Sequence, residues 1–77
     1  MKVKPDLERR DWVILSKVAE GMTNREIAVD LRCSPRRIDE ELSSIYVTLH
    51  VRNRAAAAAY FALHGRGWMF EGDLVNR

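Results

Sequence analysis

Apolar residues recur at helical spacing along most of this 77-residue chain. The longest series is Ile38, Leu42, Ile45 and Leu49, which lines one face of a helix over about three turns. Shorter series precede it, and their members are Ile14, Leu15, Val18 and Ala19, then Ile27, Ala28 and Leu31. Five alanines follow at 55–59, where alanine's helix propensity favours a further helix. The pattern predicts four helices around one core, the first from about residue 7 to 20 and the last beginning near residue 53.

Capping residues mark the expected starts of the second and third helices. Thr23 and Glu26 fit a capping box, in which each side chain accepts a hydrogen bond from the other residue's backbone N–H. Ser34 suits the N-cap of the next helix and Pro35 suits its first position. A short helix, a tight turn and a longer helix predict a helix-turn-helix, whose second helix commonly enters the DNA major groove.

The chain resembles the LuxR-type (GerE) DNA-binding domain along about four-fifths of its length. The family pattern opens with L-x-x-R-E-x-x-V-L and continues through A-E-G-x-x-N-x-E-I-A-x-x-L, S-P-x-x-I/V and I-Y-x-x-L-x-V-x-x-R. The matching residues here, with Asp11 in place of the first glutamate, are Leu7, Arg10, Asp11, Leu15, Ala19, Glu20, Gly21, Asn24, Glu26, Ile27, Ala28, Leu31, Ser34, Pro35, Ile38, Ile45, Tyr46, Leu49, Val51 and Arg54. The resemblance implies a small all-α, four-helix domain of the winged-helix-like superfamily without a wing. It also implies a regulator of transcription that binds double-stranded DNA, and we expect this chain to be a stand-alone domain of that type.

Composition limits the other classes of function. Thirteen Lys and Arg against eleven Asp and Glu leave a net charge of only +2, which is weak evidence for an anionic partner. No apolar run approaches the roughly 20 residues of a membrane span, and the charged N-terminus does not resemble a signal peptide. A single cysteine, Cys33, excludes an internal disulfide and suits a reducing cytoplasm. We expect a basic tail at 1–5, the domain at 6–65 and a C-terminal extension at 66–77.

The predicted third helix departs from the family pattern. Family members commonly show V-K-x-H where this chain has Ile38-Asp39-Glu40-Glu41, and His50 replaces a usual glycine. The helix from 35 to 49 thus carries two arginines and three carboxylates. Carboxylates are repelled by phosphates, although Asp and Glu can accept a hydrogen bond from cytosine N4. Two arginines in the first turn are unfavourable for the helix dipole and suit an anion bound there.

Two hypotheses follow from this mixture of charges. In the first, the chain is a weak or partner-assisted DNA-binding regulator, and its contact residues are Thr23, Asn24, Arg25, Arg36, Arg37, Ser43, Arg52 and Arg54. In the second, the same fold binds another regulator or the transcription machinery through an acidic face, with DNA binding reduced or lost. The residues of that alternative contact are Asp39, Glu40, Glu41, Val47, Trp68, Met69 and Phe70.

No residues suggest catalysis or a cofactor. The two histidines and the cysteine lack the spacing of a zinc site. The sequence also shows no Ser/His/Asp set and no paired catalytic carboxylates. We therefore expect no enzyme, no metal and no small-molecule substrate. The alanine-rich helix allows close approach of another helix, either within one monomer or from a second copy in a homodimer.

Overall fold

The computed structural model describes residues 7–65, which form four α-helices and no strands. They are α1 (Arg9–Ala19), α2 (Asn24–Leu31), α3 (Pro35–Leu49) and α4 (Arg54–His64). The all-α, four-helix prediction is therefore confirmed. The expected tail and C-terminal extension, with Trp68, Met69 and Phe70, lie outside the described residues.

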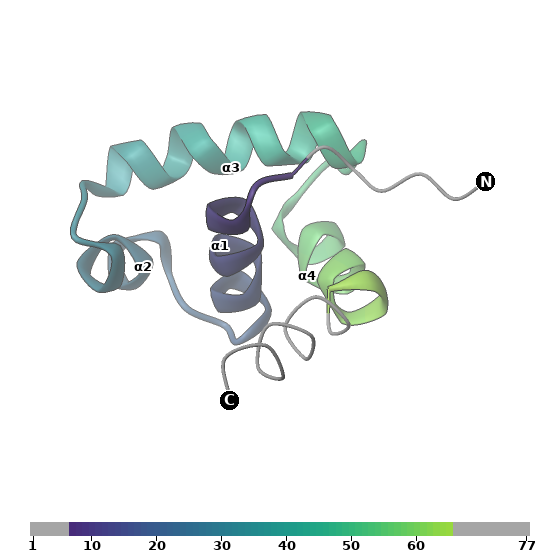
Figure 1. Cartoon of the computed structure of the whole chain (residues 1–77), viewed down its shortest axis with the longest axis horizontal. Helices are drawn as coiled ribbons and strands as arrows, with labels where there is room; N and C mark the ends of the chain where they lie inside the picture. The colour runs from purple at the N-terminus through teal and green to yellow at the C-terminus, as the bar shows by residue number, and fades with distance from the viewer. Residues whose placement is uncertain (1–6, 66–77) are drawn as a thin grey trace.

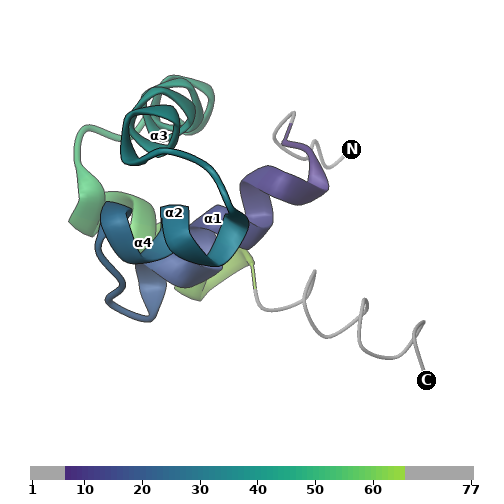
Figure 2. The ribbon, with the colours of Figure 1, turned by 90° about the vertical axis from the view of Figure 1, so that its left-hand side faces the viewer.

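Helix α3 lies across one side of the other three helices (Figures 1 and 2). Beneath it, α1 packs most extensively against α4, while α2 packs against α3. An ion pair between Lys17 and Asp30, 2.6 Å long, joins α1 to α2 at the surface. The arrangement covers only the inner side of α3, so its outer side faces away from the other helices.

The core contains most of the residues that the periodicity predicts. Its buried apolar members are Trp12, Ile14, Leu15, Val18, Ile27, Ala28, Ile38, Leu42, Ile45, Leu49, Ala57 and Phe61. Two predicted core residues differ: Ala19 is exposed, and Leu31 is only half-buried. Ala19 is the last residue of α1, where the chain turns away toward α2, so helical spacing no longer places it against the core.

The predicted starts of α2 and α3 are confirmed. The Glu26 N–H donates to Thr23 Oγ1 at 3.1 Å, and the Thr23 N–H donates to Glu26 Oε1 at 2.8 Å. Ser34 is the N-cap of α3, with Pro35 as the first helical residue. The first helix begins two residues later than expected, where Asp11 accepts a hydrogen bond from the Glu8 backbone N–H.

Shortly after the end of three of the helices, one residue adopts the left-handed region of backbone conformation. These residues are Gly21, Arg32 and His50, with φ of 89°, 60° and 59°. After each, the next backbone N–H bonds back to a carbonyl five residues earlier, as in Val51 to Tyr46 at 3.0 Å. The requirement for positive φ explains why glycine is usual in the family at the position of His50.

Removal of the α3 cap is expected to lower the free energy of unfolding by about 1 kcal/mol. Ser34 Oγ accepts a hydrogen bond from the Arg37 N–H at 3.0 Å, and Ser34→Ala leaves that N–H without this acceptor. Urea denaturation followed by circular dichroism measures the change. Ser44→Ala, at an exposed position within the same helix, is the control and should not destabilise. Equal midpoints for the two variants would contradict the role of the cap.

Candidate nucleic-acid interface

The outer face of α3 is exposed along the whole helix. Its side chains are Arg36, Arg37, Asp39, Glu40, Ser43, Ser44 and Val47, all of them exposed. The opposite face carries the buried series from Ile38 to Leu49, so one helix separates the core from a solvent-facing strip. The sequence prediction placed Glu41 beside this outer face, and the structure places it elsewhere.

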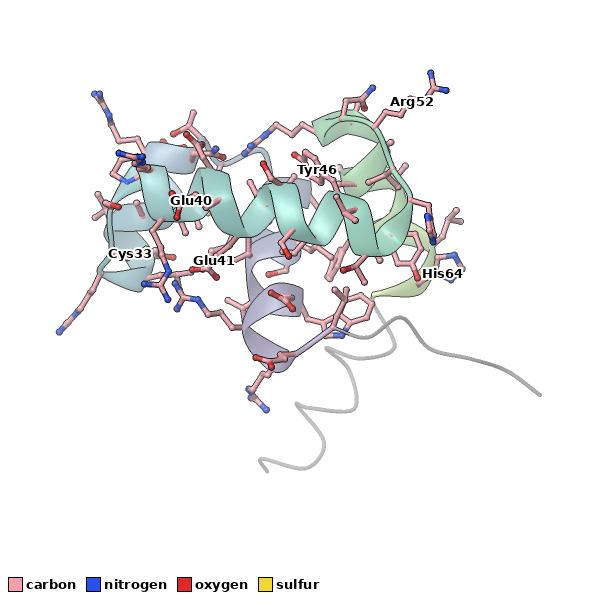
Figure 3. All side chains as sticks on the ribbon, turned by 90° about the horizontal axis from the view of Figure 1, so that it is seen from above. Cys33, Glu40, Glu41, Tyr46, Arg52 and His64 are labelled. Atoms are coloured by element: carbon pink, nitrogen blue, oxygen red, sulfur yellow. The ribbon has the colours of Figure 1, made fainter. Side chains whose placement is uncertain are left out.

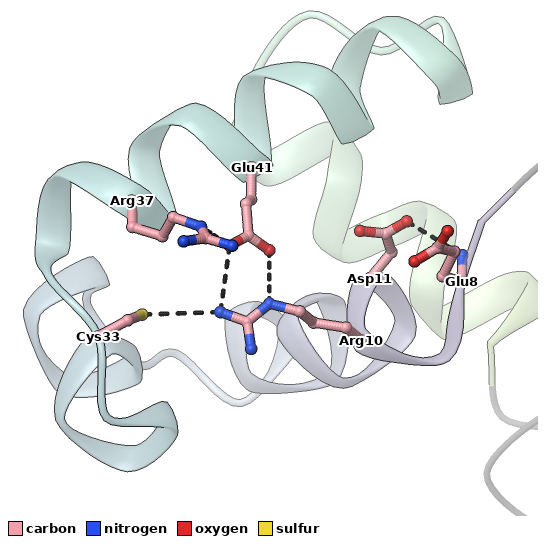
Figure 4. Close-up of polar contacts among 6 residues, drawn as sticks. All are labelled: Glu8, Arg10, Asp11, Cys33, Arg37 and Glu41. Carbon is pink, nitrogen blue, oxygen red and sulfur yellow. Dashed lines mark hydrogen bonds and ion pairs between the residues drawn. The ribbon is translucent and has the colours of Figure 1, made fainter.

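Glu41 points from α3 toward α1, where Arg10 holds it (Figure 4). Arg10 Nε donates to Glu41 Oε1 at 2.7 Å, and its Nη2 donates to Oε2 at 3.1 Å, which is a two-point guanidinium–carboxylate contact. Arg37 Nε also donates to Glu41 Oε2 at 2.8 Å. The Glu41 side chain is only 17% exposed, so it belongs to a link between α1 and α3 rather than to an outer acidic face.

This link changes the titration of both partners. The hydrogen bonds from Arg10 hold the pKa of Glu41 below its ordinary value, against the opposing effect of partial burial. The same contact raises the pKa of Arg10. Both groups therefore remain charged near neutral pH. With Glu41 paired inward, the carboxylates left on the outer face are Asp39 and Glu40.

A series of hydrogen bonds from Arg54 through Asn24 to Asp39 joins the N-terminal ends of α4 and α2 to α3. Arg54 Nη1 donates to Asn24 Oδ1 at 2.6 Å, and its Nη2 donates to the Met22 carbonyl oxygen. The Asn24 amide nitrogen in turn donates to Asp39 Oδ1. Asn24 and Arg54, predicted to contact DNA, are thus half-buried and occupied with each other. Asp39 is the exposed end of this series of hydrogen bonds.

The remaining predicted contact residues lie at three places around α3. Thr23 and Arg25 are exposed at the start of α2, and Arg36 is exposed in the first turn of α3 with its side chain 88% accessible. Arg52 lies beyond the other end of α3 (Figure 3). The arginines therefore do not form one patch: Arg36 and Arg37 stand at one end of the helix, Arg52 at the other, and Arg54 is turned toward α2.

Within residues 7–65, no three His, Cys, Asp or Glu side chains are grouped so that they could hold a metal ion. None of the helices there is long and apolar enough to cross a membrane. Cys33 is half-buried, and its sulfur lies 3.7 Å from Arg10 Nη2.

Sequence reasoning assigned no contact to Arg10, which the structure shows bonded to Glu41. Its partner Glu41 lies 31 positions away, beyond the range of any local pattern. Its position in the family's opening motif was the available signal, but that signal does not name a partner. The pairing of Asn24 with Asp39 was missed for the same reason, since 15 residues separate them.

A short helix, a tight turn and a longer helix with a free outer face define the helix-turn-helix class of DNA-binding domains. Residues 6–61 match the family described as "Bacterial regulatory proteins, luxR family". The chain belongs to the LuxR family of bacterial regulatory proteins, and its helices form a helix-turn-helix DNA-binding domain.

Three relatives support this membership. The transcriptional regulatory protein ComA of Bacillus subtilis is 43% identical over 51 residues, which are 66% of this chain and 24% of ComA. The probable HTH-type transcriptional regulator GfsR of Streptomyces halstedii is 34% identical over 61 residues, 79% of this chain and 25% of GfsR. The probable transcriptional regulator ycf29 of Cyanophora paradoxa is 31% identical over 58 residues, 75% of this chain and 28% of ycf29. The chain thus spans about a quarter of the length of these relatives.

Proposed function

We propose that α3 lies in the major groove of its target DNA and that basic side chains at its two ends contact phosphates. The observation that carries the proposal is the exposed outer face of α3, which has Arg36 at its start and Arg52 beyond its end. Fifteen residues of α-helix extend about 22 Å, whereas the major groove is about 12 Å wide. The ends of α3 therefore reach the edges of the groove while its middle faces the bases.

Each predicted contact residue takes a role that follows from its surroundings. Thr23 and Arg25 supply backbone contacts beside the groove, and Ser43 faces the base edges. Arg37 contributes charge while it remains bonded to Glu41. Asn24 and Arg54 act as positioning residues, because their polar atoms are already used between helices.

The charge of α3 is compatible with this proposal. Glu41 is neutralised by Arg10 and Arg37, and Arg36 lies 3.5 Å from Glu40 on the exposed surface. The exposed acidic and basic side chains of the outer face thus balance each other. We expect modest affinity with a shallow dependence on salt, because only a few phosphates are neutralised.

We also propose that two copies act together through α4. Leu63 is 79% exposed on that helix, next to exposed Ala62, while Ala57 is buried in the monomer's own core. A dimer would compensate for the few phosphate contacts of each copy. A cytoplasmic location follows from a role on bacterial DNA. A protein partner in transcription is not favoured as a replacement for DNA, since the matched relatives are themselves transcription regulators.

The phosphate contacts predict a specific effect on salt dependence. Arg36→Ala and Arg52→Ala are each expected to weaken duplex binding across all sequences and to reduce the slope of log affinity against log salt by about 1. Fluorescence anisotropy with a labelled duplex, titrated at several salt concentrations, measures both quantities.

The matched control is Arg9→Ala, which removes the same charge from an exposed position on α1. It should leave the slope unchanged. Equal slopes for the parent, Arg36→Ala and Arg52→Ala would show that the ends of α3 do not meet phosphates. An equal loss in Arg9→Ala would indicate a response to net charge alone.

A further inference from the structure

Asp39 occupies an unusual position for a carboxylate on a DNA-facing helix. It is exposed in the first half of α3, on the outer face between Arg36 and Ser43. A carboxylate there is repelled by phosphates unless it meets a hydrogen-bond donor. This one accepts a hydrogen bond from the Asn24 amide, which is itself held by Arg54. The surrounding residues therefore support a charged side chain at this point of the interface.

The chemistry of the three groups fixes their orientation. An arginine side chain can only donate hydrogen bonds, and an ionised carboxylate can only accept them. Asn24 must therefore turn its oxygen to Arg54 and its nitrogen to Asp39, and the reverse orientation would lose both bonds. Arg54 is held in turn by the Met22 carbonyl oxygen. The hydrogen bonds from α4 through α2 thus orient the Asp39 side chain before any DNA is present.

We propose that Asp39 is a specificity-determining residue that reads cytosine in the major groove. Its Oδ1 accepts from Asn24, which leaves Oδ2 for a donor on a base edge. The major groove offers such donors on cytosine N4 and adenine N6, and adenine places the N7 acceptor beside its amino group. A carboxylate is repelled by that second acceptor, so cytosine is the preferred partner. This inference rests on the proposed function of α3.

The orientation also lowers the cost of binding. A side chain already held in one arrangement loses less conformational entropy when it meets its partner. The positive charge of Arg54, which is bonded to the same Asn24 side chain, attracts Asp39 and offsets part of the repulsion between Asp39 and phosphates. Asn24 and Arg54 therefore act on recognition through Asp39.

Selection from a pool of duplexes with a randomised central segment tests the assignment. We expect the sites selected by the parent to contain one position at which cytosine is strongly preferred. Asp39→Asn should change the preference at that position toward adenine, because an asparagine amide pairs with adenine N6 and N7. The other positions should keep their preferences. Glu40→Gln, the same chemical change on the neighbouring exposed carboxylate, should leave cytosine preferred.

A defined duplex then tests the contact atom. Replacement of the preferred cytosine by N4-methylcytosine puts a methyl group in place of the groove-facing N–H. This change should lower the affinity of the parent protein for the duplex by about 5- to 100-fold. For the Asp39→Asn variant, the methyl group should weaken duplex binding much less than it does for the parent protein. Thermal melting of each variant checks that its fold is intact.

The outcomes separate the two proposals. Duplex binding with the same base preference in the parent and in folded Asp39→Asn would overturn this inference and leave Asp39 as a link between helices. That result would not affect the proposed placement of α3. Failure of the parent to bind any duplex at low salt would overturn the proposed function and this inference together.

Discussion

Replacement of Leu42 by alanine is expected to lower the free energy of unfolding by about 2–5 kcal/mol. Leu42 is 3% exposed and lies between the fully buried Ile38 and Ile45 on the inner face of α3. The variant loses apolar contacts and leaves a cavity under α3. A chain of this size is stabilised by only about 4–12 kcal/mol in total, so the loss is a large fraction of its stability.

Urea denaturation followed by circular dichroism measures this effect. Val47→Ala is the matched control, since Val47 lies on the outer face of the same helix and is 75% exposed. Surface substitutions of this kind change the free energy of unfolding by about 0.5 kcal/mol or less. Midpoints for Leu42→Ala and Val47→Ala that agree with each other would show that Leu42 does not support the core.

Glu41→Gln is expected to reduce the free energy of unfolding by about 1–3 kcal/mol at neutral pH, and the effect should disappear in acid. Glutamine keeps the shape of the side chain but removes the charge that Arg10 and Arg37 contact. The pKa of Glu41 is lowered in the folded state, chiefly by the hydrogen bonds from Arg10, so folding favours the ionised carboxylate.

The direction of the pH dependence follows from that lowered pKa. The contribution of Glu41 is fully present well above the ordinary pKa of 4.5 and is lost as pH falls through the lower pKa of the folded state. Denaturation curves of the parent and Glu41→Gln should therefore differ most near pH 7 and converge in acid. Glu40→Gln is the control: its pairing with Arg36 at 3.5 Å is exposed, and such pairs contribute little. A difference for Glu41→Gln that persists unchanged at low pH would contradict the ion-pair account.

The Arg10–Glu41 contact also revises how the acidic third helix is understood. From the sequence alone, three successive acidic side chains are expected to oppose DNA binding. In the structure Glu41 faces α1, and Asp39 is held by Asn24. Only Glu40 remains as an exposed acidic side chain whose described partner is its neighbour one turn away. The unusual composition of α3 thus reflects interhelical links as much as the surface that we propose to face DNA.

Local features were determined by the sequence alone. The apolar series of α3, the Thr23–Glu26 capping box and the Ser34 cap depend on residues three or four positions apart, so periodicity and residue type were sufficient to predict them. The helix-turn-helix followed from these local elements. Where the chain turns at the end of α1, the same spacing rule was wrong for Ala19, because burial there depends on the direction of the following segment.

Tertiary structure alone decided which charged groups are available on the outer face of α3. Arg10 meets Glu41 across 31 positions, and Arg54 meets Asn24 across 30. Such pairings depend on how α1 and α4 are set beneath α3, which no local pattern specifies. They remove Glu41 from the outer face, turn Arg54 away from it and orient Asp39. The physical reason is that a charged side chain interacts most strongly with the groups nearest to it in space. Those groups are known only when the helices are packed.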